Sequence, residues 1–250
     1  MPRLRRLVLL LALVPVVLGQ AQSPSDKRAA KTWVGRHQEI EEYLKTADCV
    51  SMRWSVANVF ARCTLRPGGP VARMVWRTLP PGIYRGFRES YKSEIAAYEL
   101  DKLLKMDMVP PTVERRIDGT DGAAQQFVEH VVDATDPALP DGESRARWEN
   151  DQVRMTMFDN FIGNRDRNLG AMLRDTAWNL ILVDHARAFG VESDLVRKMS
   201  GIDDAYWVRI DRLTRKQLDE ALGTWLDQNQ IDAILARRER MRAEIKARPN

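Results

Sequence analysis

Two aspartates, Asp166 and Asp184, are the residues of this chain whose type and spacing best suit chemistry. Asp166 lies in a polar stretch, and Asp184 follows an apolar run. The segments 171–173 and 179–183 have the pattern of two short strands joined by a turn at 175–178, which predicts a hairpin that carries both carboxylates to one rim. Such a rim could hold a metal ion with one carboxylate and meet a nucleophile with the other.

Local structure explains each aspartate well when it is considered alone. Asp166 would pair with Arg165 or Arg167 as a turn carboxylate, and Asp184 would end a strand beside His185. The two aspartates at this spacing, behind a long amphipathic helix, favour a reaction site over two unrelated turns.

Upstream of the aspartates, the chain has the pattern of a small antiparallel sheet with one helix and a leading helix. Turn signals rich in glycine and proline, such as RPGGP, separate the strands. The expected strands are 49–54, 59–65, 71–79, 109–117 and 123–131, and the expected helices are 31–47 and 90–104. A loop rich in proline and aspartate over 133–142 is the expected boundary with a second half.

The second half is expected to be mainly helical. An amphipathic helix over 145–162 leads directly into the acidic loop. Thr214 with Gln217 three residues later predicts a capping box at the start of another helix, and a charged helix over 231–246 ends the chain.

The two halves together resemble the atypical kinases: the phosphatidylinositol-kinase-like, HipA-like and secreted-pathway groups. Their loops follow roughly the pattern D-R-H/N-x-x-N, then a strand and I-D-x-G. The resemblance covers about 45–240 and is carried by SYKSEIAAYELDKLL, VPPTVER, DNFIGNRDRN and LVDHARAF. It implies an α+β, two-lobed protein-kinase-like fold, with a small antiparallel β lobe and its helix over 31–132 and a mainly helical lobe over 133–250.

The same resemblance implies ATP and Mg²⁺ or Mn²⁺ as cofactors and assigns roles to four side chains. Asp166 would receive the proton of the substrate hydroxyl, and Asp184 would hold the metal. Glu94 would orient the cation that binds phosphate, which is Arg77 where the family has lysine. Arginine is a planar fork that prefers bidentate carboxylate contacts, so this exchange changes the geometry of the phosphate cradle.

Three further positions complete the comparison with the kinase pattern. The resemblance implies a hinge that meets adenine through the backbone of Phe127, Val128 and Glu129. The turn 55–58 lacks the glycine that lets a loop approach phosphates closely. Ala171 stands where the pattern places a second metal-binding asparagine, and alanine has no donor atom.

The composition argues against several other functions. The formal net charge of +4 includes Arg3, Arg5 and Arg6, without which it is +1, so we expect no nucleic-acid partner. The three histidines are far apart and lack the spacing of zinc ligands. No G-x-S-x-G, P-loop or C-x-x-C motif occurs.

The first residues have the layout of a secretory signal peptide over 1–21, followed by a polar linker over 22–30. A basic start precedes an apolar run over 7–18 and the small residue Ala21. The run is shorter than the roughly 20 residues that cross a bilayer. We expect cleavage after Ala21, export to a secreted, periplasmic or lumenal compartment, and no stable membrane span afterwards. The alternative is an uncleaved N-terminal anchor.

Cys49 and Cys63 are the only cysteines. They lie on two expected strands that turn near residue 56, so an antiparallel pair would place them opposite each other. A disulfide is expected in an oxidising compartment, and two buried thiols are the alternative.

Two functions remain open from the sequence. The first is a kinase-like, ATP-dependent phosphotransferase that acts on a hydroxyl of a protein, a lipid or a small molecule. The second is an exported pseudokinase, a nucleotide-binding or protein-binding regulatory module that keeps the fold without turnover.

Overall fold

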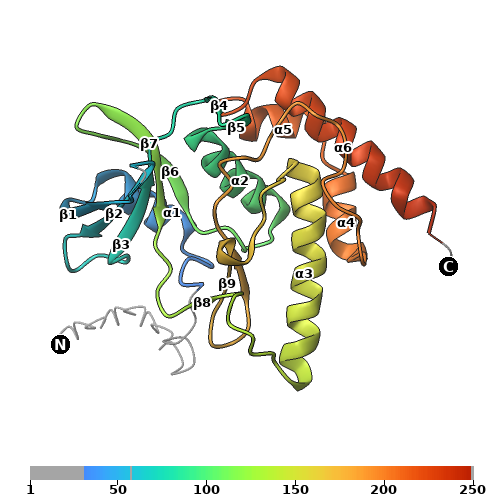
Figure 1. Cartoon of the computed structure of the whole chain (residues 1–250), viewed down its shortest axis with the longest axis horizontal. Helices are drawn as coiled ribbons and strands as arrows, with labels where there is room; N and C mark the ends of the chain where they lie inside the picture. The colour runs from blue at the N-terminus through green and yellow to red at the C-terminus, as the bar shows by residue number, and fades with distance from the viewer. Residues whose placement is uncertain (1–30, 57, 249–250) are drawn as a thin grey trace, which may run out of the picture.

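The computed structural model describes residues 31–56 and 58–248 of the chain (Figure 1). The expected signal peptide over 1–21 and linker over 22–30 lie outside the described residues. Within the described part, no helix combines the length and the apolar character needed to cross a membrane.

A five-stranded antiparallel sheet forms one half of the molecule, with the strand order β1-β2-β3-β7-β6 (Figure 1). Its strands are β1 (Cys49–Trp54), β2 (Phe60–Leu65), β3 (Arg73–Arg77), β6 (Thr112–Ile117) and β7 (Thr120–Gln126). The five strands expected from the sequence are all present, although β3 ends at Arg77 and the last strand spans 120–126 instead of the expected 123–131. Alternate residues of β2, Ala61, Cys63 and Leu65, are buried, as expected for a sheet with one face in the core.

Two helices accompany the sheet. Helix α2 (Tyr91–Leu104) lies between the sheet and the helical half (Figure 1). The Ser90 side chain caps its start by accepting a hydrogen bond from the Lys92 N–H at 3.0 Å. Helix α1 (His37–Thr46) begins later than the expected residue 31. Gly35 has a φ of 77°, a left-handed conformation that an α-helix does not contain, and the segment before it forms a turn.

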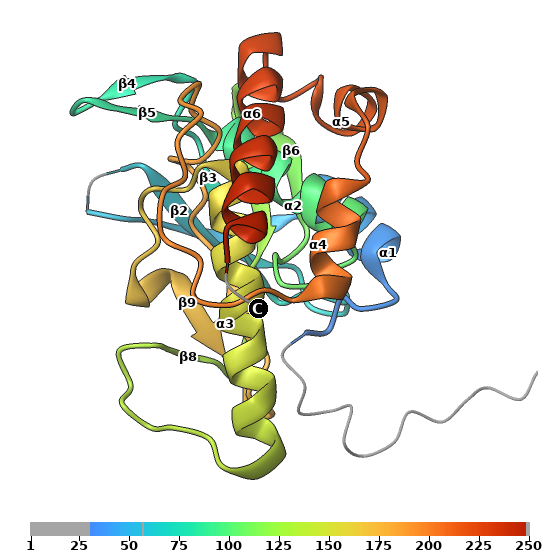
Figure 2. The same cartoon turned by 90° about the vertical axis from the view of Figure 1, so that its right-hand side faces the viewer.

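A hairpin that the sequence analysis did not predict joins β3 to α2. It consists of β4 (Gly82–Tyr84) and β5 (Phe87–Glu89), and it projects from the body of the molecule (Figure 2). The two turn residues Arg85 and Gly86 have φ values of 49° and 85°, as the tight hairpin turns with two left-handed residues require.

The second half is mainly helical, as expected. Its helices are α3 (Gly142–Ile162), α4 (Asp204–Asp211), α5 (Arg215–Leu222) and α6 (Gln228–Lys246), with the short helix η2 (Leu169–Ala171). The capping box of Thr214 and Gln217 opens α5, which confirms that prediction. Helix α4 was not predicted.

The expected acidic hairpin is present as β9 (Met172–Arg174) and β10 (Leu180–Leu182). A third strand, β8 (Val132–Asp133), pairs with β9. Because β8 lies across the expected division at 132/133, the connection between the halves is part of a small sheet. That division stays a prediction.

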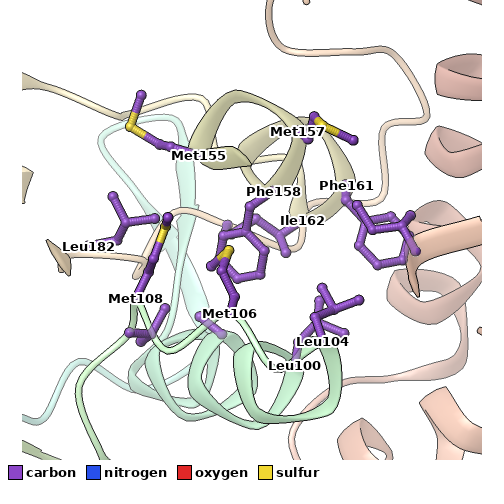
Figure 3. Packing of buried hydrophobic residues seen from close by; sticks show 14 of the residues in the cluster. Leu100, Leu104, Met106, Met108, Met155, Met157, Phe158, Phe161, Ile162 and Leu182 are labelled. Atoms are coloured by element: carbon purple, nitrogen blue, oxygen red, sulfur yellow. The ribbon is translucent and has the colours of Figure 1, made fainter. Parts of the chain in front are cut away.

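The larger hydrophobic core lies between α2 and the helical half. Figure 3 shows Leu100, Leu104, Met106 and Met108, from α2 and the segment after it, facing side chains of α3 such as Phe158. A second core fills the space under the sheet and includes Trp33, which is fully buried. Helix α2 therefore contributes apolar surface to the helical half as well as packing on the sheet.

A disulfide joins Cys49 to Cys63, with Cα atoms 5.7 Å apart, which confirms the expected bond rather than two thiols. The predicted strand register was wrong. Cys49 is opposite Leu65, and Cys63 is opposite Met52, because the pairing shifts at an irregularity after Cys49. The bond is therefore diagonal across the strand pair.

Candidate functional site

Arg77 lies between two carboxylates. Its Nε is 2.9 Å from Oε1 of Glu94, and its Nη2 is 3.2 Å from Oδ1 of Asp184. Arg77 ends β3, Glu94 is in the first turn of α2, and Asp184 follows β10, so these ion pairs join the sheet, the helix and the acidic hairpin. The Glu94 side chain is 4% exposed and that of Asp184 is 44% exposed, so Asp184 is the accessible carboxylate of the pair.

Backbone hydrogen bonds fix Asp184 relative to Glu94. The N–H of His185 donates to Oε2 of Glu94 at 2.9 Å, and the N–H of Ser90 donates to the carbonyl of Ala186 at 3.0 Å. Asp184 itself has a φ of 61°. This left-handed conformation costs a non-glycine residue about 1–2 kcal/mol, and the hydrogen bonds on its C-terminal side stabilise the turn.

The two carboxylates that contact Arg77 differ in their pKa. Burial by itself would raise the pKa of Glu94, but the positive charge of Arg77 and the hydrogen bonds to His185 outweigh burial and lower this pKa to about 2. Burial raises the pKa of Asp184 and prevails over the opposing charge of Arg77, while the nearby charge of Glu94 raises it further. Glu94 is thus ionised at neutral pH and anchors Arg77.

A buried network supports this anchor from the side of the helical half. The guanidinium of Arg167 forms two hydrogen bonds to Asp159, at 3.0 and 3.1 Å, and both side chains are fully buried. Arg167 Nη1 also donates to the carbonyl of Val183 at 2.7 Å, next to Asp184. Arg167, in the loop that carries Asp166, thus binds both the end of α3 and the backbone next to Asp184. It holds the two acidic loops against each other.

The same guanidinium determines the tautomer of His185. Arg167 Nη2 lies 2.9 Å from Nε2 of His185, and because arginine only donates, Nε2 must be the acceptor. The imidazole proton is then on Nδ1, which faces Oε2 of Glu94 at 3.6 Å. Burial lowers the pKa of His185, so the ring is neutral at neutral pH.

Asp166 occupies a separate position beside this network. Its Oδ2 accepts a hydrogen bond from Nη1 of Arg187 at 3.0 Å, and its N–H donates to the side chain of Asn164 at 3.2 Å. The alternative pairing with Arg165 or Arg167 is therefore absent. The Asp166 side chain is 45% exposed, and its charge contributes to the raised pKa of Asp184, so the two aspartates are electrostatic neighbours.

A cavity of about 340 Å³ lies between the sheet and the acidic hairpin. Phe60 and Val75 line it from the sheet, Leu173 and Val183 line it from the hairpin, and Arg77 and Asp184 are among the lining residues. A cavity of this volume with apolar walls and convergent charged groups is the form of a small-molecule site.

The expected hinge lies beside this cavity, and two of its three residues contribute to the cavity lining. Phe127 and Val128 line the cavity, whereas Glu129 pairs with Arg73 at 2.8 Å. The N–H of Phe127 already donates to the carbonyl of Arg73 at 3.0 Å. An adenine contact through a backbone N–H would therefore come from Val128 or Glu129.

Asp184 is the residue that the resemblance assigns to a metal ion. In the part of the chain that the structure describes, no three His, Cys, Asp or Glu side chains gather as metal ligands. Mg²⁺ commonly uses one or two carboxylates together with substrate phosphates, so Asp184 fits a metal that binds together with a nucleotide. Ala171 is buried and supplies no ligand, and its neighbour Gly170 lines the cavity.

The sheet cation paired with a helix glutamate, and the two acidic loops of the helical half, define an atypical kinase-like fold. No family model and no curated protein matches the sequence. Among solved structures, the chain is similar to a Golgi casein kinase with Mn/ADP bound, at 16% identity and a TM-score of 0.59 over 84% of this chain and 75% of that chain. It is also similar to hydra Fam20 with sugar, at 16% identity and a TM-score of 0.55 over 83% of this chain and 87% of that chain.

At these identities the similarity shows the fold, and it confirms the two-lobed α+β kinase-like architecture expected from the sequence. The structure brings Arg77, Glu94 and Asp184 together and places Asp166 next to them. The roles of these residues and of Phe127, Val128 and Glu129 stay predictions.

Sequence reasoning missed Asp159, Arg167 and Arg187 as parts of the site. Asp159 had a usable signal, because it interrupts the apolar end of α3 between Phe158 and Phe161, where a carboxylate must find a buried partner. Arg187 carried no such signal, since its partners are Asp166 and a residue of the unpredicted hairpin.

Proposed function

We propose that this protein is a kinase-like phosphotransferase that binds ATP with Mg²⁺ or Mn²⁺ and phosphorylates a hydroxyl acceptor. The arrangement that supports this proposal is the contact of Arg77 with both Glu94 and Asp184, with Arg77 and Asp184 lining one cavity between the two halves. Phosphoryl transfer by kinases depends on a sheet cation held by a helix glutamate and on an aspartate that holds the metal. The similar Golgi casein kinase was solved with Mn/ADP bound, which agrees with these ligands.

Each residue has a distinct task in this proposal. Arg77 neutralises negative charge on the phosphates, and Glu94 holds Arg77 in place. Asp184 holds the metal, which when bound supplies positive charge against the phosphate oxygens. Asp166 accepts the proton of the acceptor hydroxyl, and the backbone beside Val128 positions the adenine ring.

A specific contact favours a second function, that of a pseudokinase. Nη2 of Arg77 lies 3.2 Å from Oδ1 of Asp184, so the carboxylate proposed to hold the metal already has a cationic partner. Ala171 also provides no second metal ligand. A chain in which Arg77 keeps Asp184 occupied would bind nucleotide without transferring phosphate, and it would act through binding alone.

Nucleotide binding is the first test. Thermal unfolding of the mature protein should shift upward with ATP and Mn²⁺ or Mg²⁺ in the wild type but not in Asp184→Asn. The variant Asp166→Asn is the matched control, because it removes one carboxylate beside the site without touching the metal position. It should keep the nucleotide shift and lose phosphate transfer. No shift in the wild type would exclude nucleotide binding.

Turnover decides between the two functions. Phosphate transfer, or ADP formation dependent on Asp166, supports the phosphotransferase. A nucleotide shift in the wild type with no ADP formation above that of Asp166→Asn supports the pseudokinase.

We also propose export of the mature chain. The disulfide between Cys49 and Cys63 supports an oxidising compartment, since such bonds are rare in reducing cytosol. Mass spectrometry of protein recovered outside the cytoplasm should show an N-terminus at Gln22. An intact Met1 in membrane-bound protein would instead identify an uncleaved anchor.

A further inference from the structure

A second cavity, of about 270 Å³, lies on the Asp166 side of the site. Asp166 lines this cavity, whereas Asp184 lines the first one. Phe87 and Arg88 of the β4–β5 hairpin form one wall, and Gly163 and Gly190 belong to the other. The two aspartates thus serve neighbouring cavities, as a donor and an acceptor of phosphate would require.

Three arginines, Arg88, Arg165 and Arg187, and two carboxylates, Asp166 and Glu192, line this second cavity. Arg187 is already engaged, since it binds Glu89 at 2.8 Å and Asp166 at 3.0 Å. Its guanidinium also lies 4.5 Å from the centre of the Phe87 ring, so it is fixed on three sides.

The other two arginines are free to bind a ligand. Across residues 31–56 and 58–248, neither Arg88 nor Arg165 forms an ion pair with a carboxylate. Both residues are exposed, and they come from different halves of the chain: Arg88 from β5 and Arg165 from the acidic loop. Two unpaired guanidinium groups at one cavity are suited to bind an anionic group, because their planar forks match phosphate and carboxylate oxygens.

A fourth arginine adds positive charge behind the cavity wall. The side chain of Arg237 is fully buried, and its Nη1 donates to the carbonyls of Gly190 at 3.1 Å and Glu192 at 2.7 Å. Its Nη2 has no hydrogen-bond partner among the described residues. A β-carbon at Gly163 would lie 2.9 Å from its Cζ, so only glycine lets the buried guanidinium lie so close to the wall.

We propose that this second cavity is the acceptor site and that it takes a small hydroxyl compound carrying an anionic group, a phosphate ester or a carboxylate. This inference rests on the proposed function and specifies its substrate class. The volume is slightly below the range of about 300–1,000 Å³ that is usual for small-molecule sites, so the cavity suits a compact molecule rather than a folded surface. Arg88 and Arg165 bind the anionic group, and Asp166 meets the hydroxyl.

In the proposed phosphate transfer, each bond that forms is matched by one that breaks, and Asp166 receives the proton. The acceptor hydroxyl gives its proton to the Asp166 carboxylate, and its oxygen forms a bond to the γ-phosphorus of the nucleoside triphosphate. The bond between that phosphorus and the bridging oxygen breaks, and the nucleoside diphosphate leaves. Arg187, which holds Asp166 from the acceptor side, positions the base.

Binding of small probes to the mature protein without nucleotide tests the acceptor site separately from nucleotide binding. Ligand-observed NMR would compare glycerol 3-phosphate, glycerate and glycerol with wild type, with Arg88→Gln/Arg165→Gln, and with Arg85→Gln. Arg85 is the matched control, since it is in the same hairpin but outside the cavity lining. We expect the anionic probes to bind wild type and Arg85→Gln at least tenfold more tightly than glycerol, and the double variant to lose this preference.

The relative affinity of the two anionic probes identifies the anionic group. Equal binding of glycerol and both anionic probes to the wild type would overturn the inference, as would an anion preference that persists in the double variant. Binding of an acidic peptide that depends on both arginines, with no binding of the small probes, would overturn the small-molecule class. Nucleotide binding that depends on Asp184 would remain intact in each of these cases, so the proposed function would survive.

Discussion

Nη2 of Arg77 lies 3.2 Å from Oδ1 of Asp184, while Nε, on the same edge of the guanidinium, lies 2.9 Å from Oε1 of Glu94. A lysine would place one compact ammonium where arginine offers two separate nitrogens, so we expect it to keep the contact with Glu94 and to hold Asp184 less firmly. In the proposed function, in which Asp184 holds the metal, the sheet cation would therefore compete for the metal position. The identity of residue 77 would then determine the strength of metal binding.

Replacing Arg77 by lysine should strengthen metal-dependent nucleotide binding. Lysine keeps a charge for Glu94 and releases Asp184, so we expect the Kd for ATP with Mn²⁺ to fall by up to about tenfold, which corresponds to about 1.4 kcal/mol. Isothermal titration calorimetry measures this change directly. Arg62→Lys is the control, because Arg62 lines the same cavity and contacts the Phe127 ring instead of a carboxylate. An unchanged or weaker affinity in Arg77→Lys would show that Arg77 does not compete with the metal.

Removing Arg167 should destabilise the whole domain. Arg167→Ala removes the buried cation nearest to Asp159 and leaves this carboxylate with Asn164 and the more distant Arg197 at 3.7 Å. Breaking a buried ion pair costs about 3–5 kcal/mol, and the remaining partners should keep the loss at the low end of that range. Urea unfolding followed by fluorescence gives the free energy of unfolding. The neighbouring exposed residue provides the control, since Arg165→Ala should change stability by no more than about 0.5 kcal/mol. Equal effects of the two substitutions would contradict the role of Arg167 as the link between the acidic loops.

Asp101 should make stability fall as pH rises. Burial raises its pKa from 3.8 to about 7, against the opposing hydrogen bond from the Met108 N–H. The folded state therefore favours the protonated form, and this stabilisation is complete below about pH 4 and is lost as the pH rises through 7. Asp101→Asn should be more stable than wild type at about pH 8 and lose that advantage at about pH 5, in urea unfolding at both pH values. Asp118→Asn, at an exposed position, is the control for the loss of one carboxylate. An identical pH profile of stability for Asp101→Asn and wild type would refute the assignment.

The disulfide should contribute substantially to stability. Cys49 and Cys63 are 14 residues apart, and closing a loop of this length stabilises a domain by roughly 3 kcal/mol in the chain-entropy model. Reductant should therefore lower the urea midpoint of wild type but leave a Cys49→Ala/Cys63→Ala variant unchanged. Intact mass after alkylation without reductant gives an independent check, because two alkylated thiols in the exported protein would contradict the bond.

The sequence was most informative where the relevant structure is local. The hairpin with Asp184 after its second strand follows from strand periodicity and a turn, and the position of Glu94 follows from a helix that begins beside its cap at Ser90. The strand order was not accessible in the same way, because β3 pairs with β7 across a long stretch of chain. The resemblance to kinases supplied the expectation that these distant segments meet.

The contacts of individual side chains could not be predicted from the sequence either, because they too join segments that are far apart in the chain. Asp166 binds Arg187 instead of its neighbours in the chain, and that choice depends on Glu89 in a hairpin without a strong strand pattern. The register of the cysteine strands was missed because an irregularity after Cys49 shifts the pairing. Local periodicity cannot anticipate a shift of that kind.

Because helix α2 packs on both halves, we expect them to unfold as a single cooperative unit. Its side chains Tyr91 and Ile95 pack with Ala123 of the sheet, while Leu100 and Leu104 belong to the core shared with α3. Separating the halves would expose one of these surfaces to water, so neither half has a complete core alone. Calorimetry should therefore show one transition for the mature chain, and a fragment that ends at residue 132 should behave as an unfolded or aggregating polypeptide.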